Sequence, residues 1–327
     1  MRQQRTVWGS LILAILAWAI LAGNPRPSAA GAQISPVRGG PLGRGAQADP
    51  PPLETDLTLL TVTVANKAGA VTGLAKDRFQ VLEDGVEQKI AYFWADSRPL
   101  SVGFIMDGSS NMDDLMNEAI RGAGPAFLKS KRPEDEYFVI VFSDAPAMTV
   151  SYTMDAKLMP RVFPQTGEEP TYDAIYNGID AMKEAANPRK VLLVFTAGGD
   201  NGKGMNDEQL LNFALKQPVQ VYSMDMGGAT PVANALDLLA GVTGGRASIT
   251  GASSFLVEAQ CNELAQALKT QYLIGYKSTN TETNGHRRGV KVKVSSPEGS
   301  PKLTVWTKSG YYGPKVNKTK TTLAGGK

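Results

Sequence analysis

Residues 102–112, VGFIMDGSSNM, place oxygen-bearing side chains directly after an apolar run. Asp107, Ser109 and Asn111 follow one another at alternate positions. In a loop, this spacing can turn three oxygen ligands toward one point, and oxygen ligands suit hard cations such as Mg²⁺, Mn²⁺ or Ca²⁺. The same residues also suit the start of a helix, because Ser110 or Asn111 can cap it. The residue types alone leave both interpretations open.

The elements around this segment predict the fold that positions it. Between residues 98 and 270, short apolar runs alternate with segments of helical periodicity. This alternation predicts an α/β fold with a mostly parallel central sheet and helices on both faces. In such a doubly wound sheet, ligands bind beyond the carboxyl ends of the strands, at the switch in strand order. We expect Asp107 to lie at one of these ends.

Two segments of β character flank the α/β part. Residues 53–97 are predicted to form a small β module, with a hairpin turn at Asp84-Gly85 between the run that ends near Leu82 and the run from Ile90. Residues 271–313 contain three strand-like segments, which we expect to pair with the N-terminal ones. Residues 314–327 are predicted to be a disordered tail.

The N-terminus has the features of an export signal. Residues 1–32 contain a short basic region, an apolar run and Ala30-Gly31-Ala32, which together predict a cleaved signal peptide. An uncleaved anchor is the alternative, but the apolar run over residues 11–22 is short for a membrane span of roughly 20 residues. Residues 33–52 are predicted to be a flexible linker. We therefore expect a secreted or periplasmic protein without a stable membrane span after cleavage.

Charge, cysteine and histidine content exclude several classes of function. The chain of 327 residues has a formal net charge of +3, and residues 1–32 carry three arginines and no acid, so the remainder is neutral. We therefore expect no nucleic-acid partner. The single cysteine, Cys261, cannot form an internal disulfide and is predicted to be buried in a helix. The single histidine, His286, lies far along the chain from Ser109, which argues against a Ser-His catalytic pair and so against a hydrolase.

Four motifs together resemble a known family. They are VGFIMDGSSNM (102–112), FQVLEDGVEQKI (79–90), QYLIGYKS (271–278) and GYY (310–312). In combination, the chain resembles a bacterial secreted subgroup of proteins with von Willebrand factor A domains. The resemblance implies a Rossmann-like α/β domain, a metal-ion-dependent adhesion site that binds a divalent cation such as Mg²⁺, and protein binding rather than catalysis. In the family, an acidic side chain of the partner completes the coordination of the cation.

The family's first metal-binding loop is largely present in this sequence. Asp107 and Ser109 match its pattern, and Asn111 stands where the family has serine. In the second loop, alignment on residues 172–175 places Glu169 at the position of the family's threonine.

The third loop departs more strongly from the family. It reads Thr196-Ala197-Gly198, where the family has an aspartate in the middle. In the second loop, Thr171 also departs from the family, which usually has leucine at that position. Asp200 lies three residues after Ala197. The resemblance thus implies a candidate metal site of Asp107, Ser109, Asn111, Glu169, Thr171 and Asp200.

Two functions are compatible with these departures. In the first, Glu169 supplies the charge that is missing at Ala197, and the exported protein recognises a protein or extracellular ligand through a modified metal site. In the second, the site binds no metal, and the domain is a structural or assembly scaffold. We favour the first as the prediction.

Overall fold

The computed structural model describes residues 56–67, 69–108, 123, 126–127, 129–142, 146–147, 171–200, 202, 204–227, 232–251, 253–296 and 301–315. The predicted signal peptide, the predicted linker and most of the predicted tail lie outside these residues. Residues 112–130 form one of the segments of helical periodicity. Only five of these residues are described, and these five are helical.

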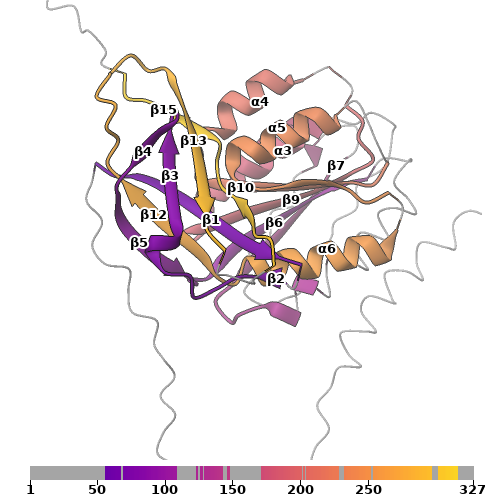
Figure 1. The fold of residues 1–327 in the computed structure, drawn as a ribbon. Coiled ribbons are helices and arrows are strands. Elements are labelled where there is room, and N and C mark those ends of the chain that lie inside the picture. Colours follow the sequence, from indigo (N-terminus) through magenta and orange to yellow (C-terminus); the bar gives the residue numbers. More distant parts are fainter. Residues whose placement is uncertain are drawn as a thin grey trace, which may run out of the picture. The chain divides into compact units, whose positions relative to one another are not determined.

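A six-stranded sheet forms the centre of the α/β part (Figure 1). Its strands are β6 (Leu100–Asp107), β7 (Glu136–Phe142), β8 (Pro146–Ala147), β9 (Arg189–Thr196), β10 (Val219–Asp225) and β11 (Ala247–Ile249). The order across the sheet is β11-β10-β9-β6-β7-β8, and every neighbouring pair is parallel except β7 with β8. Counted along the chain, this is the doubly wound order of a Rossmann-like sheet. The predicted mostly parallel α/β fold is confirmed.

Helices cover both faces of this sheet, as predicted. On one face lie α3 (Thr171–Ala181), α4 (Asp207–Ala214) and α5 (Ala233–Thr243), and on the other lies α6 (Ser254–Ala267) (Figure 1). A short 3-10 turn, η3 (Met182–Glu184), follows α3. Along β6, Phe104 and Met106 pack on the side of α6, and Ile105 packs on the side of α3. Because successive side chains of a strand point to opposite faces, a strand covered on both sides is an unbroken apolar run.

The flanking β segments form two further sheets. Their elements are β1 (Thr58–Asn66), β2 (Gly69–Ala70), η1 (Lys76–Arg78), β3 (Phe79–Glu83), β4 (Val86–Gln88), β5 (Ile90–Asp96), β12 (Gln271–Tyr276), β13 (Arg287–Val294), β14 (Thr304–Trp306) and β15 (Gly310–Tyr312). One sheet has the order β14-β1-β12-β5, with β2 beside β1, and the other has the order β15-β13-β3-β4. Strand β12 pairs with β1 and β5, and β13 pairs with β3. The predicted pairing of N-terminal with C-terminal strands is confirmed.

The hairpin prediction was right at its turn and wrong at its return strand. Asp84 and Gly85 adopt positive φ angles of 46° and 83°, as a tight two-residue hairpin turn requires. The strand that returns along β3 is β4, however, and the predicted return strand from Ile90 is β5 of the other sheet. The chain changes sheets at Lys89, and Ile90 and Phe93 of β5 then lie in the same apolar core as Val81 of β3.

Candidate functional site

The switch in strand order lies between β6 and β9. These two strands are parallel neighbours at the centre of the sheet, while the chain continues from β6 toward β7 and from β9 toward β10. The connections therefore diverge at the carboxyl ends of β6 and β9, where doubly wound folds bind ligands. Each strand ends in a buried polar residue, Asp107 on β6 and Thr196 on β9. Asp107 therefore lies at the carboxyl end of a central strand, as the sequence predicted.

Asp107 is held by the first residues of the loop after β9. Its Oδ2 accepts hydrogen bonds from the Thr196 hydroxyl and from the Ala197 amide, each at 3.2 Å. The Thr196 hydroxyl oxygen in turn accepts from the Gly198 amide at 2.8 Å. The Asp107 side chain has no exposed surface, so its charge lies in an environment of lower dielectric than water. A cation beside it would therefore be attracted more strongly than at the protein surface.

The same loop contacts the first turn of α3. The Thr171 hydroxyl donates to the carbonyl oxygen of Gly199, and this leaves its oxygen lone pairs as acceptors. Asp200 accepts from the Tyr172 amide through Oδ2 at 3.0 Å and from the Gly202 amide through Oδ1 at 2.9 Å. Asp200 thus serves as a capping group for α3, because an N-terminal amide of a helix has no partner within the helix.

A second anchor lies farther along this loop. The carboxylate of Asp173, in the first turn of α3, accepts from the Met205 amide at 3.2 Å through Oδ2. A Cβ atom on Gly204 would lie 1.7 Å from that oxygen, so any other residue there would displace the Asp173 side chain. Burial of the phenol, followed by the charges of Asp200 and Asp207, raises the pKa of Tyr172. The glycine-rich loop is therefore tied to α3 at several points.

Three of the six candidate metal ligands are described, and the structure connects them. Asp107 bonds to the start of the loop that follows β9. Farther along this loop, Gly199 bonds to Thr171 and Asp200 bonds to the amide of Tyr172. Ser109, Asn111 and Glu169 lie outside the described residues. Within the described part of the chain, no group of three or more His, Cys, Asp or Glu side chains gathers in a way that could hold a metal ion.

Ala197 occupies the position where the resembled family has an aspartate. Its side chain packs against the apolar cluster on the α6 face of the sheet, and its amide bonds to Asp107. The local charge at this edge therefore comes from Asp107 and from loop residues other than 197.

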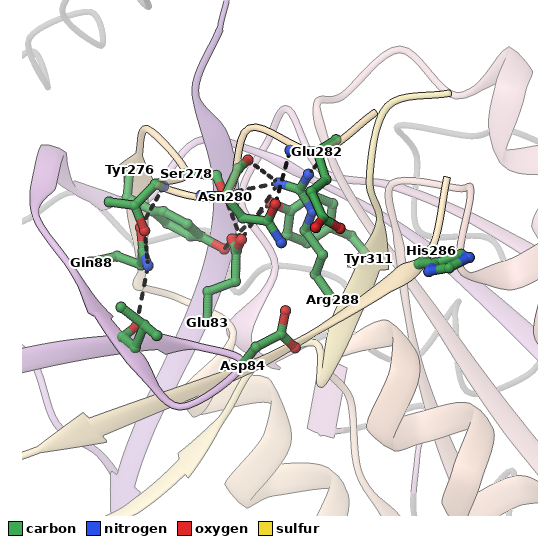
Figure 2. A network of polar contacts seen from close by, with 12 residues as sticks. Glu83, Asp84, Gln88, Tyr276, Ser278, Asn280, Glu282, His286, Arg288 and Tyr311 are labelled. Atoms are coloured by element: carbon green, nitrogen blue, oxygen red, sulfur yellow. Dashed lines mark hydrogen bonds and ion pairs between the residues drawn. The ribbon is translucent and has the colours of Figure 1, made fainter. Parts of the chain in front are cut away.

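A second buried carboxylate, Glu83, lies in the β sheets, and sequence reasoning missed it. Figure 2 shows the surrounding polar side chains converging on it. Glu83 accepts hydrogen bonds from the Tyr276 hydroxyl at 2.7 Å, the Tyr311 hydroxyl at 2.8 Å and the Ser278 hydroxyl at 2.5 Å. The Arg288 guanidinium lies 3.5 Å away. Three of the four motifs named in the sequence thus meet at one carboxylate.

Arg288 connects this carboxylate to the segment between β12 and β13. Its guanidinium donates to the Asn280 carbonyl at 2.8 Å and to the Glu282 carbonyl at 2.6 Å. Burial alone raises the pKa of Glu83, but the hydrogen bonds of Ser278 and the two tyrosines, together with Arg288, outweigh it and lower that pKa below its usual value. The carboxylate is therefore charged at neutral pH and saturated by donors of its own chain.

Comparisons with known proteins were made at the levels of family, sequence and structure. No family model matches the chain, and no curated protein matches it in sequence. A von Willebrand factor type A protein from Catenulispora acidiphila is 10% identical with a TM-score of 0.45, over 84% of this chain and 76% of that one. The ArnB paralog VWA2 from Sulfolobus acidocaldarius is 11% identical with a TM-score of 0.41, over 80% and 76%.

The PilB minor pilin from Streptococcus sanguinis is 9% identical with a TM-score of 0.42, over 53% of this chain and 62% of the pilin. This chain thus spans less than two thirds of the length of the pilin. The strand order and the helices on both faces of the sheet confirm the Rossmann-like α/β fold that the resemblance to von Willebrand factor A domains implied.

Two further predictions concern single residues and membrane spans. Cys261 is fully buried on the α6 face, and burial raises the pKa of its thiol to about 12, so the thiol is protonated at neutral pH. None of the helices in the described part of the chain is both long and apolar enough to cross a membrane.

Proposed function

We propose that this chain is an exported, non-catalytic binding protein that recognises a protein or another extracellular ligand at the carboxyl edge of its six-stranded sheet. The observation that carries the proposal is the position of Asp107, a buried carboxylate at the switch point between β6 and β9. A buried charge is costly unless it is compensated, so its retention at the ligand-binding edge of the fold favours a functional role.

The donors at this edge fit a hard divalent cation. The described candidates offer a carboxylate on Asp107 and a hydroxyl oxygen on Thr171, and both are oxygen ligands that Mg²⁺, Mn²⁺ and Ca²⁺ accept. Ser109, Asn111 and Glu169 would complete the set on the loops that follow β6 and precede α3. Once bound, the cation would supply a coordination position for an acidic side chain of the partner.

Asp200 is the weakest of the proposed ligands. Both of its carboxylate oxygens accept backbone hydrogen bonds, one from Tyr172 and one from Gly202. Moving it onto a cation would remove the cap from α3, which is worth about 1 kcal/mol. We therefore assign Asp200 to the support of the site. Among the hard divalent cations, we propose Mg²⁺ as the preferred one.

One observation favours a second function, a metal-free structural or assembly scaffold. The carboxylate of the family's third loop is replaced by Ala197, whose methyl group packs with apolar side chains. With Asp200 engaged as a cap, the described candidate ligands retain a single carboxylate, that of Asp107. The same surface would then bind its partner without a cation.

Calorimetric titration of Mg²⁺, Mn²⁺ and Ca²⁺ into the purified protein tests the proposal. Asp107→Asn keeps an oxygen that accepts from Thr196 and Ala197 while removing the charge, so we expect the fold to persist and saturable binding to disappear. Asp237→Asn is the matched control, because Asp237 is exposed on α5 and has no polar partner among the described residues. Thermal unfolding of each variant checks that binding is lost without unfolding.

The outcomes separate the candidates. Binding that is lost in Asp107→Asn and in Glu169→Gln, but kept in Asp237→Asn, supports a site with a relocated carboxylate. Binding lost only in Asp107→Asn keeps the cation and removes Glu169 from its ligands. Binding that survives in Asp107→Asn contradicts the proposed site, and absence of binding at millimolar cation favours the metal-free scaffold.

A further inference from the structure

Strand β13 carries an unusual row of basic side chains on its outward face. Its sequence is RRGVKVKV, in which Arg287, Lys291 and Lys293 are exposed while Val290 and Val292 are buried in the core between the two sheets. Lysine is depleted in β-strands, where β-branched and aromatic residues are preferred. The strand therefore presents a line of cations at positions that strand propensity does not explain.

The register of β13 fixes which side chains face outward. Arg288 points inward, where its guanidinium pairs with Glu83 and both side chains are almost fully buried (Figure 2). Lys291 lies opposite Leu82 of β3, and Lys293 lies opposite Gln80. A slip of one residue would bury the lysines and expose the valines, so the buried ion pair holds the basic row on the surface.

Two neighbouring acids compensate the positive charge of this row only in part. The exposed carboxylate of Asp84 lies beside Gly289, between Arg287 and Lys291, where it accepts a hydrogen bond from the Gly289 amide at 2.7 Å. Glu87 of β4 lies beside Leu82 on the same face, but its carboxylate accepts from the Gln80 side chain at 2.8 Å. Within the described ranges, Lys291 and Lys293 form neither ion pairs nor side-chain hydrogen bonds. Both ammonium groups are therefore available to an anionic partner.

One end of the row carries an exposed aromatic ring. Arg287 is paired in register with Tyr312 of β15, which is 40% exposed. Arg287 donates to the Ser309 hydroxyl at 2.9 Å, and the Tyr312 hydroxyl donates to Asn212 at 2.7 Å, so both side chains are held in place. A fixed aromatic ring beside a guanidinium offers a flat apolar surface next to a positive charge.

The spacing of the cations indicates the shape of the partner. With a rise of about 3.3 Å per residue, Lys291 and Lys293 are about 7 Å apart, and Arg287 and Lys293 are about 20 Å apart. Three cations along one face of a strand fit a linear molecule that carries anionic groups at intervals. The nearby Gln80 amide and the Tyr312 ring add contacts for hydroxyl groups and for a ring surface.

We propose that the outward face of β13, together with Tyr312, binds a linear acidic polysaccharide of the polyuronate class. The carboxylates of the sugar chain pair with Arg287, Lys291 and Lys293, and a sugar ring packs on Tyr312. A nucleic acid is less well matched, because single strands are held by several stacked aromatic rings and this row ends in one. An anionic membrane is less well matched, because among the described residues of β13 and β15 only Tyr312 exposes a large side chain with apolar surface that could insert beside the charges.

Binding of polygalacturonate oligomers to the full chain, measured by calorimetry in the presence of a chelator, tests this surface separately from the cation site. In low salt, the double variant Lys291→Gln/Lys293→Gln should bind at least tenfold more weakly than the unmodified protein. The slope of log K against log salt should also fall by about 1 to 2, because fewer counterions are released. The matched control is Lys129→Gln/Lys216→Gln, which removes the same charge from two exposed sites elsewhere.

The remaining arms identify the partner class. Tyr312→Ala should weaken binding severalfold at a salt concentration where the charge effect is screened, and a neutral polymer such as dextran should not bind. No binding of polygalacturonate, or equal binding by the lysine variant and the control, overturns the proposal. Tighter binding to phosphatidylcholine vesicles containing phosphatidylglycerol, or to single-stranded DNA, at the same ionic strength also overturns it.

Discussion

Asp107 and Glu83 are both buried carboxylates at the last position of a strand, yet their surroundings differ. Glu83 receives three side-chain hydroxyl groups and lies beside a buried arginine, with partners drawn from three separate segments of the chain. Asp107 accepts from one hydroxyl and one backbone amide of the loop after β9, each at 3.2 Å. The shorter hydrogen bonds to Glu83 have the length of strong charge-assisted bonds.

This difference separates a structural charge from a candidate binding charge. Glu83 joins the turn after β3, the segment after β12 and the strand β15, so its charge stabilises the arrangement of the β sheets. Asp107 lies at the edge of a doubly wound sheet where loops meet, the place at which such folds bind ligands. Burial alone does not distinguish the two roles, whereas the position of each carboxylate in the fold does.

The largest expected effect tests the structural role of Glu83. Glu83→Gln leaves the buried Arg288 guanidinium without a countercharge, and breaking a buried ion pair in this way costs about 3–5 kcal/mol. Denaturant unfolding should show this loss in the free energy of unfolding. The control Glu87→Gln changes an exposed carboxylate on the same sheet and should remain within about 0.5 kcal/mol. Equal effects in the two variants would remove the special role of Glu83.

The same charge predicts how stability depends on pH. The pKa of Glu83 is lowered in the folded state, so its stabilising contribution is complete above the ordinary glutamate pKa and is lost as the pH falls through the lowered value. The difference in unfolding free energy between the unmodified protein and Glu83→Gln should therefore shrink on acidification from pH 7. A difference that stays constant down to pH 3 would contradict this explanation.

A smaller effect is expected where two backbones meet beside Asp107. A Cβ atom on Gly227 would lie 2.1 Å from the carbonyl oxygen of Ala197, so Gly227→Ala must displace the loop that holds Asp107. We expect a loss of about 1–3 kcal/mol and a change in any cation affinity. The control Gly241→Ala lies in α5 with open space around it and should raise stability by up to about 1 kcal/mol. Unchanged stability in Gly227→Ala would contradict the close approach.

The smallest expected effect concerns the cap of α3. Asp200→Ala removes the acceptor for the Tyr172 amide and should cost about 1 kcal/mol, whereas Asp200→Asn keeps an acceptor and should cost less. Because we assign Asp200 to support, both variants should retain cation binding if the protein binds a cation. Loss of cation binding in Asp200→Asn with unchanged thermal stability would instead make Asp200 a direct ligand.

The fold of the α/β part could be predicted because its signals are local and repeated. Apolar runs such as KVLLVFT have the composition of strands covered on both faces, and the helices between them carry the matching periodicity. The end of β6 at Asp107 followed from the same pattern. The hairpin turn at Asp84-Gly85 was also readable, because few residue pairs adopt its two positive φ angles.

The partners of the polar residues could not be predicted in this way. Glu83 and Tyr276 are 193 positions apart, and Asp107 and Thr196 are 89 positions apart, so no local pattern relates them. The change of sheet at Lys89 was missed for a related reason, since it depends on the core that β3 and β5 share. Such contacts depend on how the sheets pack.

The sequence by itself determined the elements, the turn, the class of fold and the residue types present at the carboxyl edge. Periodicity and turn chemistry act over a few neighbouring residues, so they are visible in one dimension. Only the tertiary structure decided that Glu83 is saturated with hydrogen-bond donors and that Asp200 caps α3. It also decided that Arg287, Lys291 and Lys293 form one surface row. Those outcomes depend on the strand order and register that bring distant segments together, and on the burial that then raises the cost of an unpaired charge.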